Sequence, residues 1–119
     1  MNFSILIHET AEVFARRDEP AQRPVLYAPI GAYLQALRDA GVFVGGAGLE
    51  GPATATVLIA NGTGWKVQDG PFADAKEQLA GIIIIDVPDR ERALEWARRF
   101  PTQPGRKIEL RANLIPPSE

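Results

Sequence analysis

Four consecutive isoleucines at positions 82–85 restrict the fold of this chain more than any other feature. They lie in the segment 81–87 (GIIIIDV), and a short β-branched run of this kind is typical of a strand. Side chains along a strand point alternately to the two faces of its sheet. Because this strand is apolar at odd and even positions alike, both faces of its sheet are expected to be covered.

The remaining segments predict a mixed α+β domain. Further strands are predicted at 2–7, 42–44, 53–60, 65–68 and 107–111. One helix has Pro29 near its start and Gly41 just past its end, and a second has Asp89 as its N-cap. The polar segment 9–28 is interpreted as a connection with one helical turn near 11–16. The order is β-α-β-β-α-β, the ferredoxin-like arrangement with two helices on one face of an antiparallel sheet.

Two helices on one face would leave the other face of the sheet bare. The simplest cover for an apolar sheet face is a second copy of the same sheet, related by two-fold symmetry. We therefore predict a homodimer, a dimeric α+β barrel, with a cleft in each protomer between the sheet and the helices or loops. A long loop folded over the sheet is the alternative cover.

Length and charge restrict the function classes. Of the 119 residues, 45% are hydrophobic and 24% are charged, which predicts one globular domain over 1–119 with its core at 1–114 and a frayed tail at 115–119. The net charge of −2 argues against nucleic acid as a partner. No secretory signal is recognisable, and the longest apolar run, 80–85, is far shorter than the ~18 residues of a membrane span, so we expect a cytoplasmic protein without membrane binding. The absence of cysteine excludes disulfides and thiolate metal sites.

Several short motifs occur together in an order and spacing typical of one family. They are Gly45-Gly46-Ala47-Gly48-Leu49, Asp69-Gly70-Pro71-Phe72-Ala73, Lys76-Glu77-Gln78-Leu79, Asp86-Val87-Pro88-Asp89 and Ala93-Leu94-Glu95-Trp96-Ala97. With these motifs the chain strongly resembles the DGPF family of the YCII-related superfamily, from Phe3 to about Leu114.

The resemblance implies a dimeric α+β barrel of the ferredoxin-like class. Relatives are mostly uncharacterised bacterial proteins, and some are encoded beside extracytoplasmic-function sigma factors, which implies a link to that pathway. More distant YCII-like proteins are proposed to use a His–Asp pair in the cleft for acid–base chemistry, and a few relatives act on chlorinated or hydroxylated aromatic intermediates. This chain departs from the pattern, because no histidine stands near Ile30 or Tyr33 and no acid stands at Phe100 or Pro101.

Asp69 and His8 are the candidates for catalysis. A turn at the cleft mouth, packed by Phe72, Trp65 or the isoleucine strand, would make Asp69 a general acid or base. Asp before Gly-Pro is also an ordinary turn signal, in which the carboxylate caps backbone amides. His8 is the only histidine, and its side chain is of the type that titrates near neutrality. It stands at the end of the first strand, either as a cleft residue or as a partly exposed side chain without function.

Five further residues are candidates for ligand binding. Lys76 and Glu77 follow the Asp-Gly-Pro turn at a spacing that brings them beside its aspartate, or else they form an exposed ion pair. Arg111 and Thr54 either present polar groups to a small anionic ligand or are the polar positions of half-exposed strands. Tyr33 lies on the apolar stripe of its helix and is expected in the core, with its hydroxyl at the edge of the cleft.

The glycine-rich segment 45–48 does not have the spacing of a dinucleotide-binding fingerprint, and a strand follows it instead of a helix. It predicts a bulge or a close approach of strand and helix. No cofactor is implied, and the spacing of His, Asp and Glu predicts no metal site.

Two classes of function remain open. One is a non-catalytic dimer that binds an unknown small molecule or a protein partner and is linked to sigma-factor regulation. The other is a cofactor-free acid–base enzyme of the lyase, isomerase or hydrolase type, acting on a small acidic or phenolic substrate with Asp69 as base. An RNA-binding domain has the same element order, but the segment 53–60 (ATATVLIA) lacks the aromatic residues that stack on bases. The missing dyad favours binding.

Overall fold

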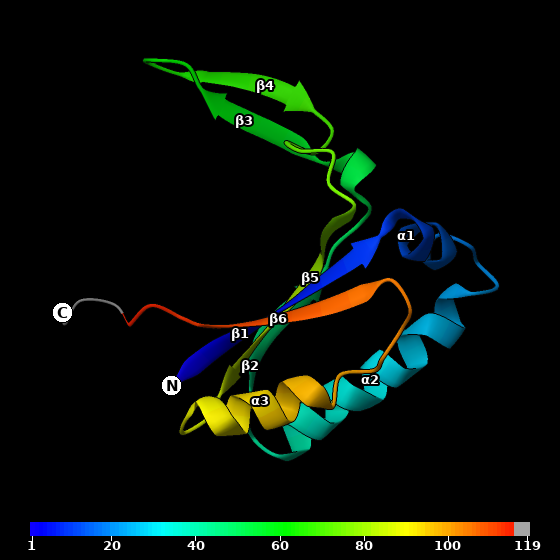
Figure 1. The fold of residues 1–119 in the computed structure, drawn as a ribbon, viewed down its shortest axis with the longest axis vertical. Coiled ribbons are helices and arrows are strands. Elements are labelled where there is room, and N and C mark those ends of the chain that lie inside the picture. Colours follow the sequence, from blue (N-terminus) through cyan, green and yellow to red (C-terminus); the bar gives the residue numbers. More distant parts are fainter. Residues whose placement is uncertain (116–119) are drawn as a thin grey trace.

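A computed structural model describes residues 1–115 of the protein (Figure 1). Residues 116–119 of the predicted tail lie outside this range. In chain order the elements are β1 (Asn2–Thr10), α1 (Ala11–Arg17), α2 (Arg23–Asp39), β2 (Phe43–Gly48), η1 (Pro52–Thr54), β3 (Thr56–Ala60), β4 (Trp65–Asp69), β5 (Glu77–Asp86), α3 (Arg90–Arg98) and β6 (Arg106–Ala112). None of the described helices combines the length and the apolar character that a bilayer span requires.

Four strands form the main sheet, in the order β2-β5-β1-β6, and every neighbouring pair is antiparallel. The isoleucine strand β5 and the N-terminal strand β1 occupy the centre. Figure 1 shows α2 and α3 together on one side of this sheet. The result is a mixed α+β domain with an antiparallel sheet and three helices, consistent with the predicted ferredoxin-like class.

The strands β3 and β4 do not belong to the main sheet. They pair only with each other, and Figure 1 shows their hairpin projecting away from the four-stranded sheet. The Asn61-Gly62 turn signal correctly predicts a hairpin, with Gly62 at a φ of +98°. The strand predicted over 53–60 is wrong in its first three residues, since η1 comes first and β3 begins at Thr56. The places beside β5 are taken by β1 and β2, so no edge of β5 is left for β3.

The glycine-rich segment is part of the strand β2, which is therefore longer than predicted. Pairing with β5 shifts register between Phe43 and Gly45. A Cβ added at Gly46 would lie 2.6 Å from the carbonyl oxygen of Ile82, closer than a side chain tolerates. The predicted bulge or close approach at these glycines is thus confirmed, although the approach is to a neighbouring strand.

The segment 9–28 contains the predicted helical turn near 11–16, which is confirmed as α1, but it is not a connection throughout, because α2 already begins at Arg23. Pro24 stands in the first turn, where its missing N–H removes no intrahelical hydrogen bond. Pro29 lies inside the helix and leaves the carbonyl of Val25 without its usual donor. Val25 is 73% exposed, so water can supply the missing hydrogen bond and the helix continues.

The predicted helix ends at Gly41 and Asp89 are confirmed. Gly41 follows α2 with a φ of +73°, a conformation that favours glycine, and its N–H donates to the carbonyl of Arg38 at 3.0 Å. At the start of α3 the carboxylate of Asp89 accepts the N–H of Arg92 at 2.9 Å. An N-cap of this type stabilises a helix by about 1 kcal/mol.

The two faces of the sheet differ in what covers them. Toward the helices, alternate residues of the two central strands are buried in the core: Phe3, Ile5, Ile7, Ile83 and Ile85. The open face carries the intervening residues Leu6, Ile82 and Ile84, which are only partly buried. Within one chain, the expected cover of the isoleucine strand is therefore complete on one face only.

Candidate functional site

A cleft with a volume of about 210 Å³ lies between α2 and the helix-facing side of the sheet. Residues spaced four apart share one face of a helix, and such a row of α2 lines the cleft: Leu26, Ile30, Leu34 and Arg38. Opposite them, Gly46 and Gly48 of β2 line it without side chains. A Cβ added at Gly48 would meet nothing within 4 Å. The cleft wall at Gly48 therefore has room for a side chain.

A buried ionic cluster forms one end of the cleft. The carboxylate of Glu9, at 3% exposure, accepts hydrogen bonds from Arg17 Nη1 at 3.4 Å and from Arg106 Nε at 2.8 Å. Arg17 also donates from Nε to the hydroxyl of Tyr27 at 3.1 Å and from Nη2 to the carbonyl of Leu49. Two guanidinium groups thus share one carboxylate, and the cluster has an excess of one positive charge.

Aromatic rings hold both guanidinium groups in place. The guanidinium of Arg17 lies 4.9 Å from the ring centre of Phe14, and that of Arg106 lies 5.3 Å from the ring centre of Phe100. The face of an aromatic ring attracts a cation, more strongly where water is excluded. These contacts orient the two planar groups at the end of the cleft.

The charged lining of the cleft is mainly cationic. A third arginine, Arg38, lies over the ring of Phe43 with its guanidinium 4.8 Å from the ring centre. The other charged lining residues are Arg17, Arg106 and Glu9. This excess of positive charge stands in a chain whose net charge is −2. A cleft of one sign with apolar walls focuses the field on a ligand of the opposite sign.

This cluster is not predicted from the sequence, although the alternation of buried residues along two strands indicates that Glu9 and Arg106 face the core. Glu9 continues the alternation of buried residues in β1 that begins at Phe3, and Arg106 stands two residues before the partly buried Ile108 in β6. A charged residue at a core-facing position needs a partner of opposite charge. The burial of Arg17 could not be predicted in the same way, because Arg17 ends α1 within the segment 9–28, which the sequence predicts as a connection.

Of the positions near which the resemblance would place a catalytic pair (Ile30 or Tyr33, and Phe100 or Pro101), one from each half lies in this cleft. Ile30 of α2 and Phe100, which follows α3, both line it. Neither side chain can transfer a proton. The cleft therefore offers an apolar surface where the YCII-like proteins are proposed to have acid–base groups.

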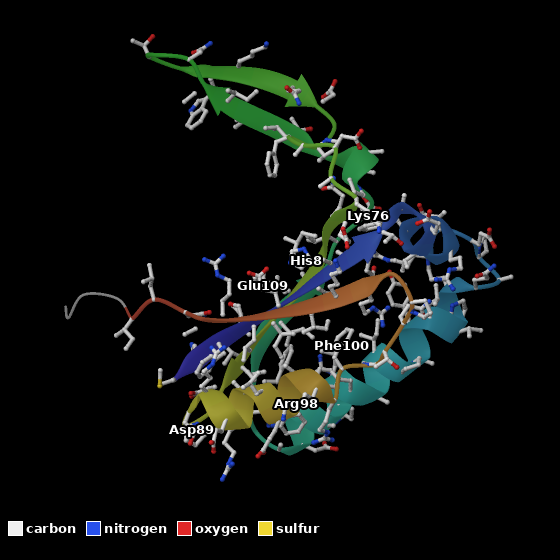
Figure 2. The ribbon with its side chains drawn as sticks, viewed as in Figure 1. His8, Lys76, Asp89, Arg98, Phe100 and Glu109 are labelled. Atoms are coloured by element: carbon white, nitrogen blue, oxygen red, sulfur yellow. The ribbon has the colours of Figure 1, made fainter. Side chains whose placement is uncertain are left out.

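Three of the predicted site residues lie on the open face of the sheet instead, each beside a charged residue of β6. His8 Nε2 lies 3.0 Å from Glu109 Oε1, and Figure 2 shows these two side chains together on the side of the sheet opposite α3. Arg111 Nε is 3.9 Å from the other oxygen of Glu109, and Glu77 forms an ion pair with Lys107 of β6. His8, Glu77 and Arg111 thus belong to a polar strip on the open face, outside the cleft.

Among the described residues, Lys76 forms an ion pair neither with Asp69 nor with Glu77. The pKa of Glu77 is lowered, chiefly by the hydrogen bond from Lys107 and further by the positive charges of Lys107 and Lys76. The charge of Lys76 also contributes to the lowered pKa of Glu12 in α1, after the hydrogen bonds at Glu12 itself. The positive charge of Lys76 thus acts on carboxylates of α1 and β5.

Asp69 and Thr54 lie at the base of the projecting hairpin. Asp69 ends β4, where it pairs with Thr56 of β3, and its side chain is exposed. Thr54 belongs to η1, and its hydroxyl donates to the carbonyl of Gly51 at 2.7 Å. Neither Asp69 nor Thr54 lines the cleft beneath α2.

Tyr33 is buried, as predicted, but its hydroxyl does not reach the cleft. The hydroxyl donates to the carbonyl of Trp96 at 2.7 Å, and the ring meets Phe100 edge to face at 5.1 Å between ring centres. Burial raises the pKa of Tyr33 to about 12. Tyr33 therefore fixes α2 to α3 and keeps its proton in the folded chain.

The difference in the free energy of unfolding between the wild type and Tyr33→Phe should shrink as the pH rises. Near neutral pH the lost hydrogen bond should lower the free energy of unfolding by about 1 kcal/mol. Between about pH 10 and 12 the unfolded wild type ionises at this tyrosine while the folded chain does not, so the folded wild type loses stability there. Urea unfolding of both proteins at pH 8, 10 and 11 measures the difference. A difference that stays constant with pH would contradict the raised pKa.

Over residues 1–115, no group of three or more His, Asp or Glu side chains is arranged to hold a metal ion.

The fold and the cleft define a class: a small α+β domain with a cationic cleft between its helices and one face of an antiparallel sheet. The chain belongs to the YCII-related domain family, whose sequence pattern it matches over residues 1–106. A stretch of 48 residues is 44% identical to "Uncharacterized protein R00369" of Rhizobium meliloti (strain 1021). That stretch covers 40% of this chain and 39% of the relative. The predicted resemblance is thus confirmed at the level of the YCII-related family.

Proposed function

We propose that this YCII-related domain binds a small organic molecule in the cleft beneath α2. The observation that carries the proposal is a cavity of about 210 Å³ with apolar walls and a buried cluster of Arg17, Glu9 and Arg106 at one end. Apolar walls with a few fixed polar groups are typical of small-molecule sites. Ile30 and Phe100 at the dyad positions favour binding over catalysis.

The assignment to a group within the YCII-related family, and any link to a pathway, rest on the sequence motifs. The segment from Asp69 to Phe72 supports membership of the DGPF group within the family, and the link to sigma-factor regulation rests on that resemblance alone. A cofactor-free enzyme with Asp69 as its base has less support, because Asp69 does not line the cleft.

Filling the cavity tests the proposal. Gly48 lines the cleft with open space around it and has no positive φ, so Gly48→Leu should fold and occupy the cavity. Gly31→Leu is the matched control, since Gly31 lies on α2 outside the cleft with equally open surroundings. In a thermal-shift screen of neutral and charged fragments, a ligand at about 100 times its Kd should stabilise the wild type and the control by ~2.7 kcal/mol, or several degrees.

Gly48→Leu should lose that stabilisation. Fragments that stabilise Gly48→Leu as much as the wild type would contradict the cleft as the binding site. A screen in which no fragment stabilises the wild type would contradict small-molecule binding and favour a protein partner.

We also propose that the protein is a homodimer whose two open faces pack together. Leu6, Ile82 and Ile84 form an apolar row across the central strands, only partly buried in one chain. The polar strip beside them contains both signs of charge, with Lys107 and Glu109 on the same strand. Such a mixed surface can complement itself about a two-fold axis.

Ile84→Glu should convert the dimer to a monomer. Burying an unpaired carboxylate between two sheets is costly, whereas in the monomer this position is partly open to water. Val25→Glu is the control, because Val25 is 73% exposed on α2, away from the open face. Light scattering at micromolar concentration should give twice the chain mass for the wild type and the control. A monomeric wild type would contradict the proposal.

A further inference from the structure

We infer that the ligand of the cleft is a small carboxylic acid with an apolar body, whose carboxylate binds between Arg17 and Arg106. This inference rests on the proposed function, because it assigns a chemical class to the ligand of the same cleft. Three observations lead to it: the charge of the buried cluster, its unused hydrogen-bond donors, and the size and apolar character of the space beside it.

The buried cluster lacks one negative charge. Arg17 has a side chain that is 10% exposed and Arg106 one that is 5% exposed, and Glu9 is the carboxylate that both contact. An unpaired charge away from water is costly unless a counter-charge is supplied. A second carboxylate at this end of the cleft would balance the cluster.

The two guanidinium groups also have donors to spare. Each guanidinium has five N–H donors in one plane. Arg106 donates from Nε to Glu9 and from Nη1 to the carbonyl of Pro101 at 2.8 Å, and its Nη2 has no hydrogen-bond acceptor among the described residues. The contact from Arg17 Nη1 to Glu9, at 3.4 Å, is at the long end for a hydrogen bond. A carboxylate is planar and accepts paired N–H donors from such groups.

The adjoining space fits a small apolar body. A dry protein cavity of about 150 Å³ is large enough for benzene, and this cleft has about 210 Å³. Leu26, Ile30 and Leu34 of α2 face Ile83 of the sheet across it. Inorganic phosphate would satisfy the guanidinium groups but would leave these apolar walls uncovered. An aromatic or short aliphatic acid satisfies both parts of the cleft.

Pairs of acid and amide test the inference on the full chain. The probes are benzoate with benzamide, hexanoate with hexanamide, and inorganic phosphate, with Kd measured by calorimetry. At least one of the two acids should bind at least about tenfold more tightly than its amide and than phosphate, because a charge-assisted hydrogen bond replaces a neutral one. Gly48→Leu should abolish this binding and Gly31→Leu should retain it.

Removing the internal carboxylate gives an independent readout. In Glu9→Gln the two guanidinium groups lose their counter-charge, so the acid that binds the wild type should bind this variant about tenfold more tightly. A gain in affinity is a result that mere structural damage would not produce. If this variant does not fold, the acid–amide ratio and Gly48→Leu decide the question with the folded proteins.

These measurements distinguish a failure of the carboxylic-acid inference from a failure of the proposed function. If the amides bind as tightly as the acids, and Gly48→Leu abolishes both, the carboxylate class is wrong while the proposed function stands. If phosphate binds more tightly than either acid, the apolar body is wrong. If none of these probes binds, the inference is overturned, and the proposed function is then judged by the fragment screen alone.

Discussion

Glu9→Ala is expected to lower the free energy of unfolding by about 3–5 kcal/mol, because it leaves two guanidinium groups buried without their counter-charge. Glu9 is 3% exposed and accepts hydrogen bonds from Arg17 at 3.4 Å and from Arg106 at 2.8 Å. Arg17 lies at the end of α1, which directly follows β1, whereas Arg106 lies at the start of β6, 97 residues after Glu9. The carboxylate therefore joins these elements at the end of the cleft.

Urea unfolding at fixed protein concentration measures this loss. Glu50→Ala is the control, because Glu50 is exposed and forms no hydrogen bond or ion pair with the other residues described, and its free energy of unfolding should change by no more than about 0.5 kcal/mol. Equal stability of Glu9→Ala and the control would show that the cluster does not contribute to folding.

Ile85→Ala is expected to cost about 2–5 kcal/mol, since it opens a cavity in the middle of the sheet. Ile85 has no exposed surface, and it pairs with Phe3 of β1 on one side and Phe43 of β2 on the other. Its side chain belongs to the core cluster that includes Phe3. The lost transfer free energy of the side chain and the unfilled space add to each other.

Ile115→Ala is the matched control for this variant, with the same change of side chain at 79% exposure. The control should stay within about 0.5 kcal/mol of the wild type in the same urea titration. A loss below about 1 kcal/mol for Ile85→Ala would mean that the chain relaxes into the space, against the tight core described for these strands.

The central strands could be predicted from the sequence because their signals are local. Alternation in β1 and the run of isoleucines in β5 depend on the two-residue period of a strand, which no distant residue alters. The Asn61-Gly62 turn and the N-cap at Asp89 likewise depend on only a few neighbouring residues. The presence of these elements is therefore predicted correctly, although β1 continues to Thr10 and β5 begins at Glu77, beyond the predicted ranges 2–7 and 81–87.

The place of β3 and the start of α2 could not be predicted, because neither depends on local chemistry alone. Thr56 has the same strand preference beside β4 as it would have beside β5. Which strand β3 pairs with is decided by β1 and β2, which occupy both edges of β5. Pro29 normally marks a helix boundary, but α2 continues through it at a point where Val25, the residue four positions before it, is exposed to water. Leu26, the first residue of the row that lines the cleft, is missed together with the first turns of that helix.

The hairpin of β3 and β4 pairs only with itself, whereas the cleft is built from α2 and the main sheet. A two-stranded hairpin is at best marginally stable alone in water. Its hydrogen bonds can therefore break and re-form in local opening events that leave the four-stranded sheet closed. The chain thus combines two levels of cooperativity: a segment that opens at low cost and a core that opens only when the whole domain unfolds. Insertions at the hairpin tip, around Gly62, should accordingly leave the arrangement of Glu9 and its two arginines intact.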